Sequence, residues 1–221
     1  KGSLVLIDAC QSLAHQKLDV IDLNIDFLAG SGHKLCGPTG IGFLWSRQEI
    51  LEKIPPLFGG GEMIQDVFEE SSTWAELPHK FEAGTPAIAE AIGLAAAISY
   101  INSIGLNEIH EYEKNITKYL FKKLNQIDGI EIIGPSPEID PERASLATFY
   151  IKNMHSNDIA EILDSKGICI RSGHHCCQPL HRYIGIKSTA RISMNFTTNK
   201  EEIDIFLEKL KETINFLKMN S

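Results

Sequence analysis

Three short apolar segments within the first 45 residues constrain the fold more than any other feature of this chain. The first, residues 4–7 (Leu-Val-Leu-Ile), ends at Asp8 and is typical of a strand buried on both faces of a sheet. Residues 25–29 and 41–45 predict two further short strands. The sequence therefore predicts an α/β fold whose sheet begins close to the start of the chain.

A lysine-bearing turn lies between the second and third predicted strands. It opens with Ser31-Gly32-His33-Lys34 and closes with residues 37–40 (Gly-Pro-Thr-Gly). Ligand sites of open α/β sheets lie beyond the carboxyl ends of the strands. We therefore expect Asp8 and Lys34 to meet at one edge of the sheet.

An acid and a lysine in this arrangement suit pyridoxal phosphate. The lysine binds the cofactor aldehyde covalently, and the carboxylate of Asp8 keeps the ring nitrogen protonated, so that the ring withdraws electrons. Gln11 is a candidate donor to the phenolic oxygen, and Ser31 and His33 are candidate phosphate ligands. An Asp at a strand end and a Gly-His-Lys turn also occur as a plain turn former and a solvated turn. The cluster alone leaves both interpretations open for Lys34.

A second group of chemically active residue types spans residues 171–180 (Arg-Ser-Gly-His-His-Cys-Cys-Gln-Pro-Leu). Predicted strands on either side bring Arg171 and Arg191 close to the two ends of this loop. Two guanidinium groups recognise a carboxylate well, and neighbouring His and Arg side chains favour the nucleophilic thiolate of Cys176. This combination indicates attack on an amino-acid substrate.

Zinc is the alternative for a loop with two histidines and two cysteines. Four consecutive residues cannot all surround one tetrahedral ion, and the usual ligand pairs, separated by about two to four residues, are absent. The spacing therefore disfavours a metal site. The other four cysteines are predicted to be small buried apolar residues: Cys10, Cys36, Cys169 and Cys177.

Five segments, in order along the chain, carry a resemblance to a known family. They are residues 8–11 (Asp-Ala-Cys-Gln), 31–40, 58–64 (Phe-Gly-Gly-Gly-Glu-Met-Ile), 81–86 (Phe-Glu-Ala-Gly-Thr-Pro) and 171–176. On these segments nearly the whole chain resembles the C-terminal half of a SufS-like, group II cysteine desulfurase, within the class V aminotransferase family of fold-type I pyridoxal-phosphate enzymes. The resemblance implies part of the large cofactor domain over residues 1–103 and a small α/β domain over residues 104–221 that carries the cysteine loop.

The resemblance assigns the first cluster to the cofactor. Lys34 is expected to carry pyridoxal phosphate and Asp8 to pair with its ring nitrogen. The remaining cofactor-binding positions that the resemblance implies are Gln11, Ser31, His33 and Thr85. Thr85 would reach the phosphate bound by a neighbouring subunit, so the family likeness implies a homodimer.

The resemblance assigns the second cluster to sulfur transfer. Cys176 is expected to take the sulfur of L-cysteine as a persulfide while L-alanine is released, with Arg191 holding the substrate carboxylate and Arg171 assisting. Only five positions separate Arg171 from Cys176, which fits the short loop of group II. A SufE- or SufU-like protein would accept the sulfur for iron-sulfur cluster assembly.

The family likeness also places a stretch of roughly equal length before this chain, with a phosphate-binding turn and a histidine that stacks on the cofactor. The chain opens at Lys1-Gly2-Ser3, directly before a predicted core strand, so we expect a fragment that is inactive alone. A selenocysteine lyase or another class V lyase or aminotransferase would keep Lys34 without depending on Cys176. A non-catalytic fragment that only dimerises or binds a sulfur-relay partner is the third interpretation.

Composition limits the class of partner and compartment. The net charge of -8 disfavours a nucleic-acid surface, and no apolar run approaches the roughly 18 residues of a membrane span. Five cysteines, an odd number at irregular spacing, suit a reducing compartment. The resemblance implies the bacterial cytoplasm or the plastid stroma.

Periodicity predicts the other elements. Helices are expected over 86–101, 106–127 and 201–217 and from Ser156 onward, strands over 145–151, 168–170 and 189–194, and a surface loop over 134–143. The alanine-rich helix over 86–101 is predicted to be largely buried.

Overall fold

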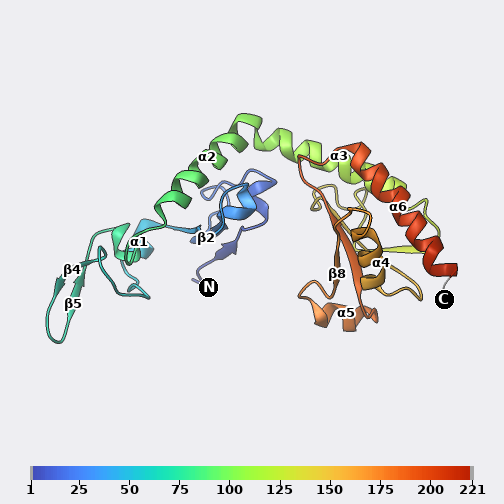
Figure 1. Ribbon diagram of the computed structural model, residues 1–221. Helices are drawn as coiled ribbons and strands as arrows, with labels where there is room; N and C mark the ends of the chain where they lie inside the picture. Colours follow the sequence, from blue (N-terminus) through green and yellow to red (C-terminus); the bar gives the residue numbers. More distant parts are fainter. Residues whose placement is uncertain (1, 220–221) are drawn as a thin grey trace. The chain divides into compact units, whose positions relative to one another are not determined.

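The computed structural model describes residues 2–219. The chain is mixed α/β and divides into two compact units, an N-terminal unit that ends at Glu108 and a C-terminal unit that begins at Ile109 (Figure 1). The two candidate site clusters fall in different units. Lys34 belongs to the first and Cys176 to the second.

The N-terminal unit contains a three-stranded sheet in the order β1-β2-β3. Its strands are β1 (Leu6–Asp8), β2 (Phe27–Ser31) and β3 (Gly42–Ser46). β1 and β2 are parallel, with Asp8 opposite Ala29, and β3 returns antiparallel to β2. The 3-10 helices η1 (Ser12–Ala14) and η2 (Gly32–Leu35) follow the carboxyl ends of β1 and β2. The parallel pairing therefore brings both strand ends to one edge.

The prediction that the first strand is buried on both faces is wrong for the described residues. Leu4 is 61% and Leu6 59% exposed. β1 has one neighbouring strand, and within residues 2–219 its outer face has no covering element. The buried apolar cluster of this sheet consists of Ala9, Ile25 and Leu28.

The rest of the N-terminal unit consists of short elements and one long helix. These are α1 (Gln48–Leu51), the hairpin of β4 (Ile64–Val67) and β5 (Ser72–Trp74), η3 (His79–Phe81) and α2 (Ile88–Ile104). The hairpin forms a two-stranded sheet of its own. α2 packs against η2. The helix is where the sequence predicted it, apart from its ends.

The predicted burial of α2 is wrong. One stripe is buried, formed by Leu94, Ala97 and Ile101, while Ile92 is 69% exposed. The stripe has the spacing of one helix face, and η2 contacts the helix. Other apolar side chains of α2 are exposed, among them Ile88 at 58%.

The C-terminal unit is built around a four-stranded antiparallel sheet in the order β6-β7-β9-β8. The strands are β6 (Ile130–Ile133), β7 (Leu146–Ile151), β8 (Arg171–Gly173) and β9 (Thr189–Ser193). The helices are α3 (Leu106–Leu124), whose first three residues belong to the N-terminal unit, α4 (Ser156–Asp164), α5 (Gln178–Ile184) and α6 (Lys200–Met219). Side chains of α3, α4, α6, β7 and β9 share one contiguous core.

Strict alternation along β7 explains this core. Its inward residues Ala147 and Phe149 are fully buried and Ile151 is 4% exposed, as expected for a strand with one face on a helix layer. The predicted strand over 145–151 is confirmed, and α3 and α6 lie where the periodicity placed them, with ends that differ by at most three residues. The predicted strand over 168–170 is wrong, because pairing with β9 begins at Arg171.

The start of α4 is fixed by a side chain outside the helix. The helix begins at Ser156 as predicted, but its cap is His155, whose Nδ1 accepts a hydrogen bond from the Asn157 N–H at 3.2 Å. α5, β6 and the β4–β5 hairpin were not predicted. Each helix or strand among them is seven residues long or shorter.

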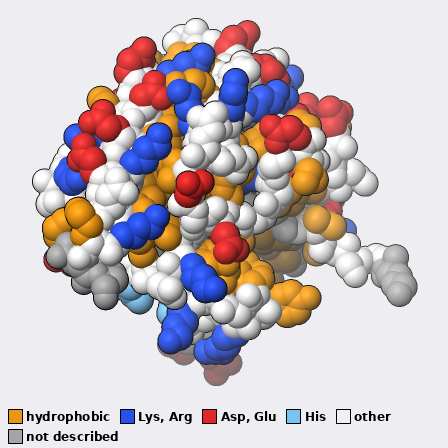
Figure 2. Space-filling view, turned by 90° about the vertical axis from the view of Figure 1, so that its right-hand side faces the viewer, with side chains coloured by type: hydrophobic (Ala, Val, Ile, Leu, Met, Phe, Trp, Pro, Cys, Tyr) orange, Lys and Arg blue, Asp and Glu red, His pale blue; other side chains and the backbone are white. Residues whose placement is uncertain are grey.

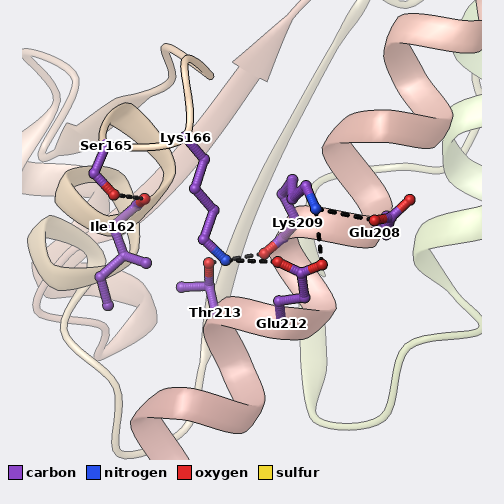
Figure 3. A network of polar contacts seen from close by, with 7 residues as sticks. All are labelled: Ile162, Ser165, Lys166, Glu208, Lys209, Glu212 and Thr213. Atoms are coloured by element: carbon purple, nitrogen blue, oxygen red, sulfur yellow. Dashed lines mark hydrogen bonds and ion pairs between the residues drawn. The ribbon is translucent and has the colours of Figure 1, made fainter.

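A polar network joins the end of α4 to α6 (Figure 3). The ammonium groups of Lys166 and Lys209 each lie 2.8 Å from the Glu212 carboxylate. Hydrogen bonds from these two lysines lower the pKa of Glu212 to about 2. On the face drawn in Figure 2, acidic and basic side chains are interspersed.

Within residues 2–219 the structure contains no single helix that is long and apolar enough to cross a membrane. The consecutive helices α2 and α3 pass the length and composition test only when taken together as a bent pair.

Candidate functional site

Lys34 is presented to solvent by a tightly packed turn. It lies in η2, directly after β2, and both His33 and Lys34 are exposed whereas Gly32 and Leu35 are buried. The Gly32 N–H donates to the Ile41 carbonyl at 2.9 Å, and a Cβ at position 32 would lie 2.7 Å from the Ile41 side chain. Only glycine fits this approach, so the backbone of the turn is fixed while the amine remains free to react.

Asp8 ends β1 at the same edge as the lysine turn. Hydrogen bonds from the thiol and the backbone N–H of Cys10, the latter at 3.0 Å, lower the pKa of Asp8, and the nearby Lys34 ammonium lowers it further against the opposing effect of burial. The carboxylate is therefore charged at neutral pH. The expected meeting of Asp8 and Lys34 at one sheet edge is confirmed.

The other predicted cofactor positions differ in how closely they join this cluster. The Ser31 hydroxyl lies 3.1 Å from Nδ1 of His33, and Gln11 is exposed at the start of η1. Thr85 is exposed in the loop before α2. Their roles in cofactor binding stay predictions.

The cysteine loop is a tight reverse turn in the left-handed region of backbone space. The His174 carbonyl accepts the Cys177 N–H at 2.9 Å, and the two residues between them, His175 and Cys176, have φ angles of 52° and 62°. Two consecutive positive φ angles across such a bond define a type I′ turn, which normally requires Asn or Gly. Each ordinary side chain held there costs about 1–2 kcal/mol. Strain of this kind is typical of functional sites.

The turn presents an exposed thiol to an arginine. Nη2 of Arg171 lies 3.3 Å from Sγ of Cys176, and Arg171 is directly opposite Arg191 in the register of β8 and β9. Burial, followed by the charge of Arg171, lowers the pKa of Arg191. Arg171, His174, His175 and Cys176 line an open hollow of about 450 Å³. Two cations beside a thiol can hold a carboxylate next to a nucleophile.

The His175 side chain, next to Cys176, is an uncharged ring. Burial lowers its pKa most, and the charges of Arg191 and Arg171 lower it further. Because the ordinary histidine value is 6.5, the ring is neutral at pH 7. The positive charge beside Cys176 therefore comes from the two arginines.

The prediction of four buried cysteines is wrong. Cys36 and Cys169 are exposed, and Cys10 and Cys177 are half-buried; all five cysteines are free. The reason is local: Cys36 has a left-handed backbone at the end of η2, and Cys177 precedes the first residue of α5. Turn and cap positions lie at the surface, which overrides the apolar character of the thiol.

Sequence reasoning missed two buried residues beneath the cysteine turn. His181 on α5 is 4% exposed and Thr189 on β9 is 1% exposed. Nε2 of His181 lies 3.0 Å from the Thr189 hydroxyl, and Nδ1 lies 3.2 Å from the Cys177 carbonyl. The available signals were Pro179 in the first turn and Gly185 just after the helix, which are typical helix boundaries.

The comparison with protein families decides the affiliation of the chain. The model of the aminotransferase class-V family matches residues 1–206. The chain belongs to the class-V family. The predicted class-V affiliation and the predicted α/β fold are thereby confirmed.

Class-V relatives resemble the chain along nearly its whole length. A "Probable cysteine desulfurase" of Synechocystis sp. is 54% identical over 215 residues, which are 97% of this chain and 51% of that protein. The apo structure of a cysteine desulfurase from Thermococcus onnurineus has a TM-score of 0.91 and 39% identity, and the match covers 97% of this chain and 53% of that one. This class-V chain spans about half the length of the curated relatives it matches.

A more distant solved structure contains a bound cofactor. A mutant of C-DES with glycine covalently linked to its pyridoxal-phosphate cofactor has a TM-score of 0.78 and 26% identity. The match covers 94% of this chain and 51% of that structure.

Proposed function

We propose that this chain contributes to a pyridoxal-phosphate-dependent cysteine desulfurase of the SufS-like, group II kind. The observation that carries the proposal is the exposed Cys176 thiol, held on a strained turn 3.3 Å from the Arg171 guanidinium. The names of the class-V relatives and the lysine cluster of the N-terminal unit support it.

The donor set of the N-terminal unit fits pyridoxal phosphate. The carboxylate of Asp8, which is charged at neutral pH, lies at the end of β1, and the exposed amine of Lys34 follows the end of the parallel strand β2. The Ser31 hydroxyl and the His33 imidazole form a pair in the same turn as Lys34. Lys34 would bind the cofactor aldehyde covalently, and Asp8 would hold its ring nitrogen protonated. When bound, the cofactor supplies an electron sink for the substrate Cα.

The chain's own groups would then carry the proton and the sulfur. Nζ of Lys34 takes the proton from the Cα of L-cysteine, while Arg191 and Arg171 hold the carboxylate. Sγ of Cys176 attacks the substrate sulfur, the bond between that sulfur and carbon breaks, and the carbon receives a proton. L-cysteine and one thiol thus give L-alanine and one enzyme persulfide, with no external oxidant or reductant.

The proposal extends to assembly and sulfur delivery. Thr85 would reach the cofactor phosphate of a second subunit in a homodimer, and a SufE- or SufU-like acceptor would take the persulfide sulfur for iron-sulfur cluster assembly. The five free cysteines are compatible with a reducing compartment, which we propose to be the bacterial cytoplasm or the plastid stroma.

The proposal is tested by assaying L-alanine and protein-bound persulfide from L-cysteine. The full-length protein is compared with Cys176→Ala and with the matched control Cys177→Ala, which removes the adjacent thiol. We expect persulfide in the wild type and in Cys177→Ala, and none in Cys176→Ala. A Cys176→Ala variant that still produces alanine at the wild-type rate would favour a selenocysteine lyase or another class-V lyase or aminotransferase. A wild-type protein that binds no cofactor at all would indicate a non-catalytic role.

A further inference from the structure

One buried imidazole contacts the residues on both sides of Cys176. The ring of His181 meets that of His174 edge-on with centroids 5.4 Å apart, and that of His175 at 6.1 Å. Its Nδ1 lies 3.2 Å from the Cys177 carbonyl. Since the ring is 4% exposed, these contacts are made inside the unit rather than in solvent. We propose that His181 is a positioning residue that holds the Cys176 turn in its reactive geometry.

The opposite side of the ring is anchored in the sheet. Nε2 of His181 lies 3.0 Å from the hydroxyl of Thr189, which is 1% exposed on β9. Arg191, the residue proposed to hold the substrate carboxylate, lies two positions further along the same strand. His181 therefore couples the turn that carries the thiol to the strand that carries the carboxylate ligand.

The hydrogen-bond partners define which ring nitrogen carries the proton. The Cys177 thiol donates to the His174 carbonyl at 2.9 Å. The Cys177 carbonyl can only accept, so Nδ1 of His181 is the donor. Nε2 then accepts from the Thr189 hydroxyl, so each ring nitrogen of His181 has a partner. Replacing the Thr189 hydroxyl by a methyl group would leave Nε2 buried without its donor.

The left-handed turn needs such an anchor. His175 and Cys176 have positive φ angles that neither side chain favours, so a turn released from His181 would relax and displace Sγ of Cys176 from Arg171. A displacement of this kind lowers the rate of a positioned reaction more than it changes binding. This inference rests on the proposed function, because its effect is on sulfur transfer to Cys176.

The test uses the full-length protein loaded with pyridoxal phosphate and the variants Thr189→Val and Thr189→Ser. Thr189→Val removes the hydroxyl at constant shape, and Thr189→Ser restores it. Thr213→Val is the matched control, because Thr213 is fully buried in α6 and donates only to the Lys209 carbonyl. His181→Asn keeps a donor near Nδ1 but cannot reach Thr189, so it provides a second route to the same result.

Two readouts are measured. The first is the single-turnover rate of persulfide formation as a function of L-cysteine concentration. We expect Thr189→Val and His181→Asn to lower the limiting rate by about tenfold to a hundredfold, with half-saturation changed by less than about twofold. Thr189→Ser and Thr213→Val should retain the wild-type rate within about threefold. The second readout is the imidazole 15N spectrum of selectively labelled histidine, in which wild-type His181 should carry its proton on Nδ1, with Thr189→Val alone altering the Nε2 signal.

Each result decides between the claims. Equal rates for Thr189→Val and Thr213→Val, or a wild-type His181 protonated on Nε2, would overturn the positioning role. A wild-type protein that forms no persulfide on Cys176 contradicts the proposed function instead. In that case the positioning role is tested by the rate at which iodoacetamide alkylates Cys176. The positioning role requires this rate to change in Thr189→Val and to stay at the wild-type value in Thr213→Val.

Discussion

The two units differ in how completely they bury apolar side chains, and this difference separates two ways of presenting a reactive group. In the C-terminal unit, Phe149, Leu163 and Leu210 are fully buried in one contiguous core. In the N-terminal unit, the sheet buries only a small cluster around Leu28, and the apolar side chains of Leu4 and Ile92 are exposed. The thiol therefore stands on a well-supported scaffold that can hold backbone strain, whereas the lysine lies at the edge of an open sheet.

Core truncation in each unit should give the largest measurable contrast. Phe149→Ala should lower the unfolding free energy by about 3–5 kcal/mol, and Leu28→Ala should lie at the low end of about 2–5 kcal/mol because little surrounds it. Both tryptophans, Trp45 and Trp74, belong to the N-terminal unit. In urea titrations, Leu28→Ala should therefore lower the midpoint of the transition seen by tryptophan fluorescence. Phe149→Ala should lower the midpoint of the transition seen by far-UV circular dichroism. If both variants moved both signals equally, the units would not unfold separately.

Relief of the strained turn should give the next largest effect. At Cys176, with a φ of 62°, glycine avoids the cost of a left-handed side chain. Cys176→Gly should therefore be more stable than Cys176→Ala by about 0.5–1 kcal/mol. Cys169 lies outside the left-handed residues, so the same pair of substitutions there should have the opposite order. Thermal unfolding of the four variants provides the measurement, and the same order at both sites would argue against strain in the turn.

His175 should make the C-terminal unit less stable in mild acid. Its folded pKa lies below the ordinary value of 6.5, so below pH 6.5 the unfolded chain binds a proton that the folded chain resists. Stability should fall as the pH drops from 7 toward 5, and His175→Gln should weaken this dependence. Thermal unfolding followed by circular dichroism at several pH values tests the slope, with the exposed His33→Gln as control. Parallel curves for wild type and His175→Gln would refute the assignment.

The smallest effect is expected at the network between α4 and α6. The pKa of Glu212 is lowered from 4.5 to about 2, so its contribution is complete above pH 4.5 and is lost as the pH falls toward 2. Glu212→Gln should reduce the thermal midpoint slightly at pH 7, because exposed ion pairs contribute little. The difference in thermal midpoint between Glu212→Gln and wild type should disappear in acid and at high salt. The exposed Glu161→Gln is the control, and a gap that is independent of pH would contradict this origin.

Local patterns explain which parts of the fold were predictable. The alternation in β7 and the amphipathic periods of α3 and α6 extend over enough residues to define an element, and they placed its ends to within three residues. The seven-residue helix α5 is too short for such a period. The burial of α2 and β1 depends on which other elements pack against them, and a local sequence pattern does not predict those elements.

The candidate site was predictable in its residues but not in its geometry. The meeting of Asp8 with Lys34 followed from the parallel order of two strands. The left-handed turn at Cys176 could not be anticipated, because Cys does not signal a positive φ and the enrichment of His among such residues is too weak to locate a turn. The hydrogen-bonded pair of His181 and Thr189 depends on contact between α5 and β9. Both elements are too short for a sequence pattern to predict how they pack.

The central claim is that Lys34, at the sheet edge of the N-terminal unit, carries the cofactor. The most direct test is to locate the cofactor chemically. The full-length protein is loaded with pyridoxal phosphate, reduced with borohydride, digested and mapped by mass spectrometry. We predict that the pyridoxyl mass lies on the peptide that contains Lys34 and is absent from Lys34→Ala. A folded wild-type protein that carries the mass on another lysine, or carries none, would contradict the account.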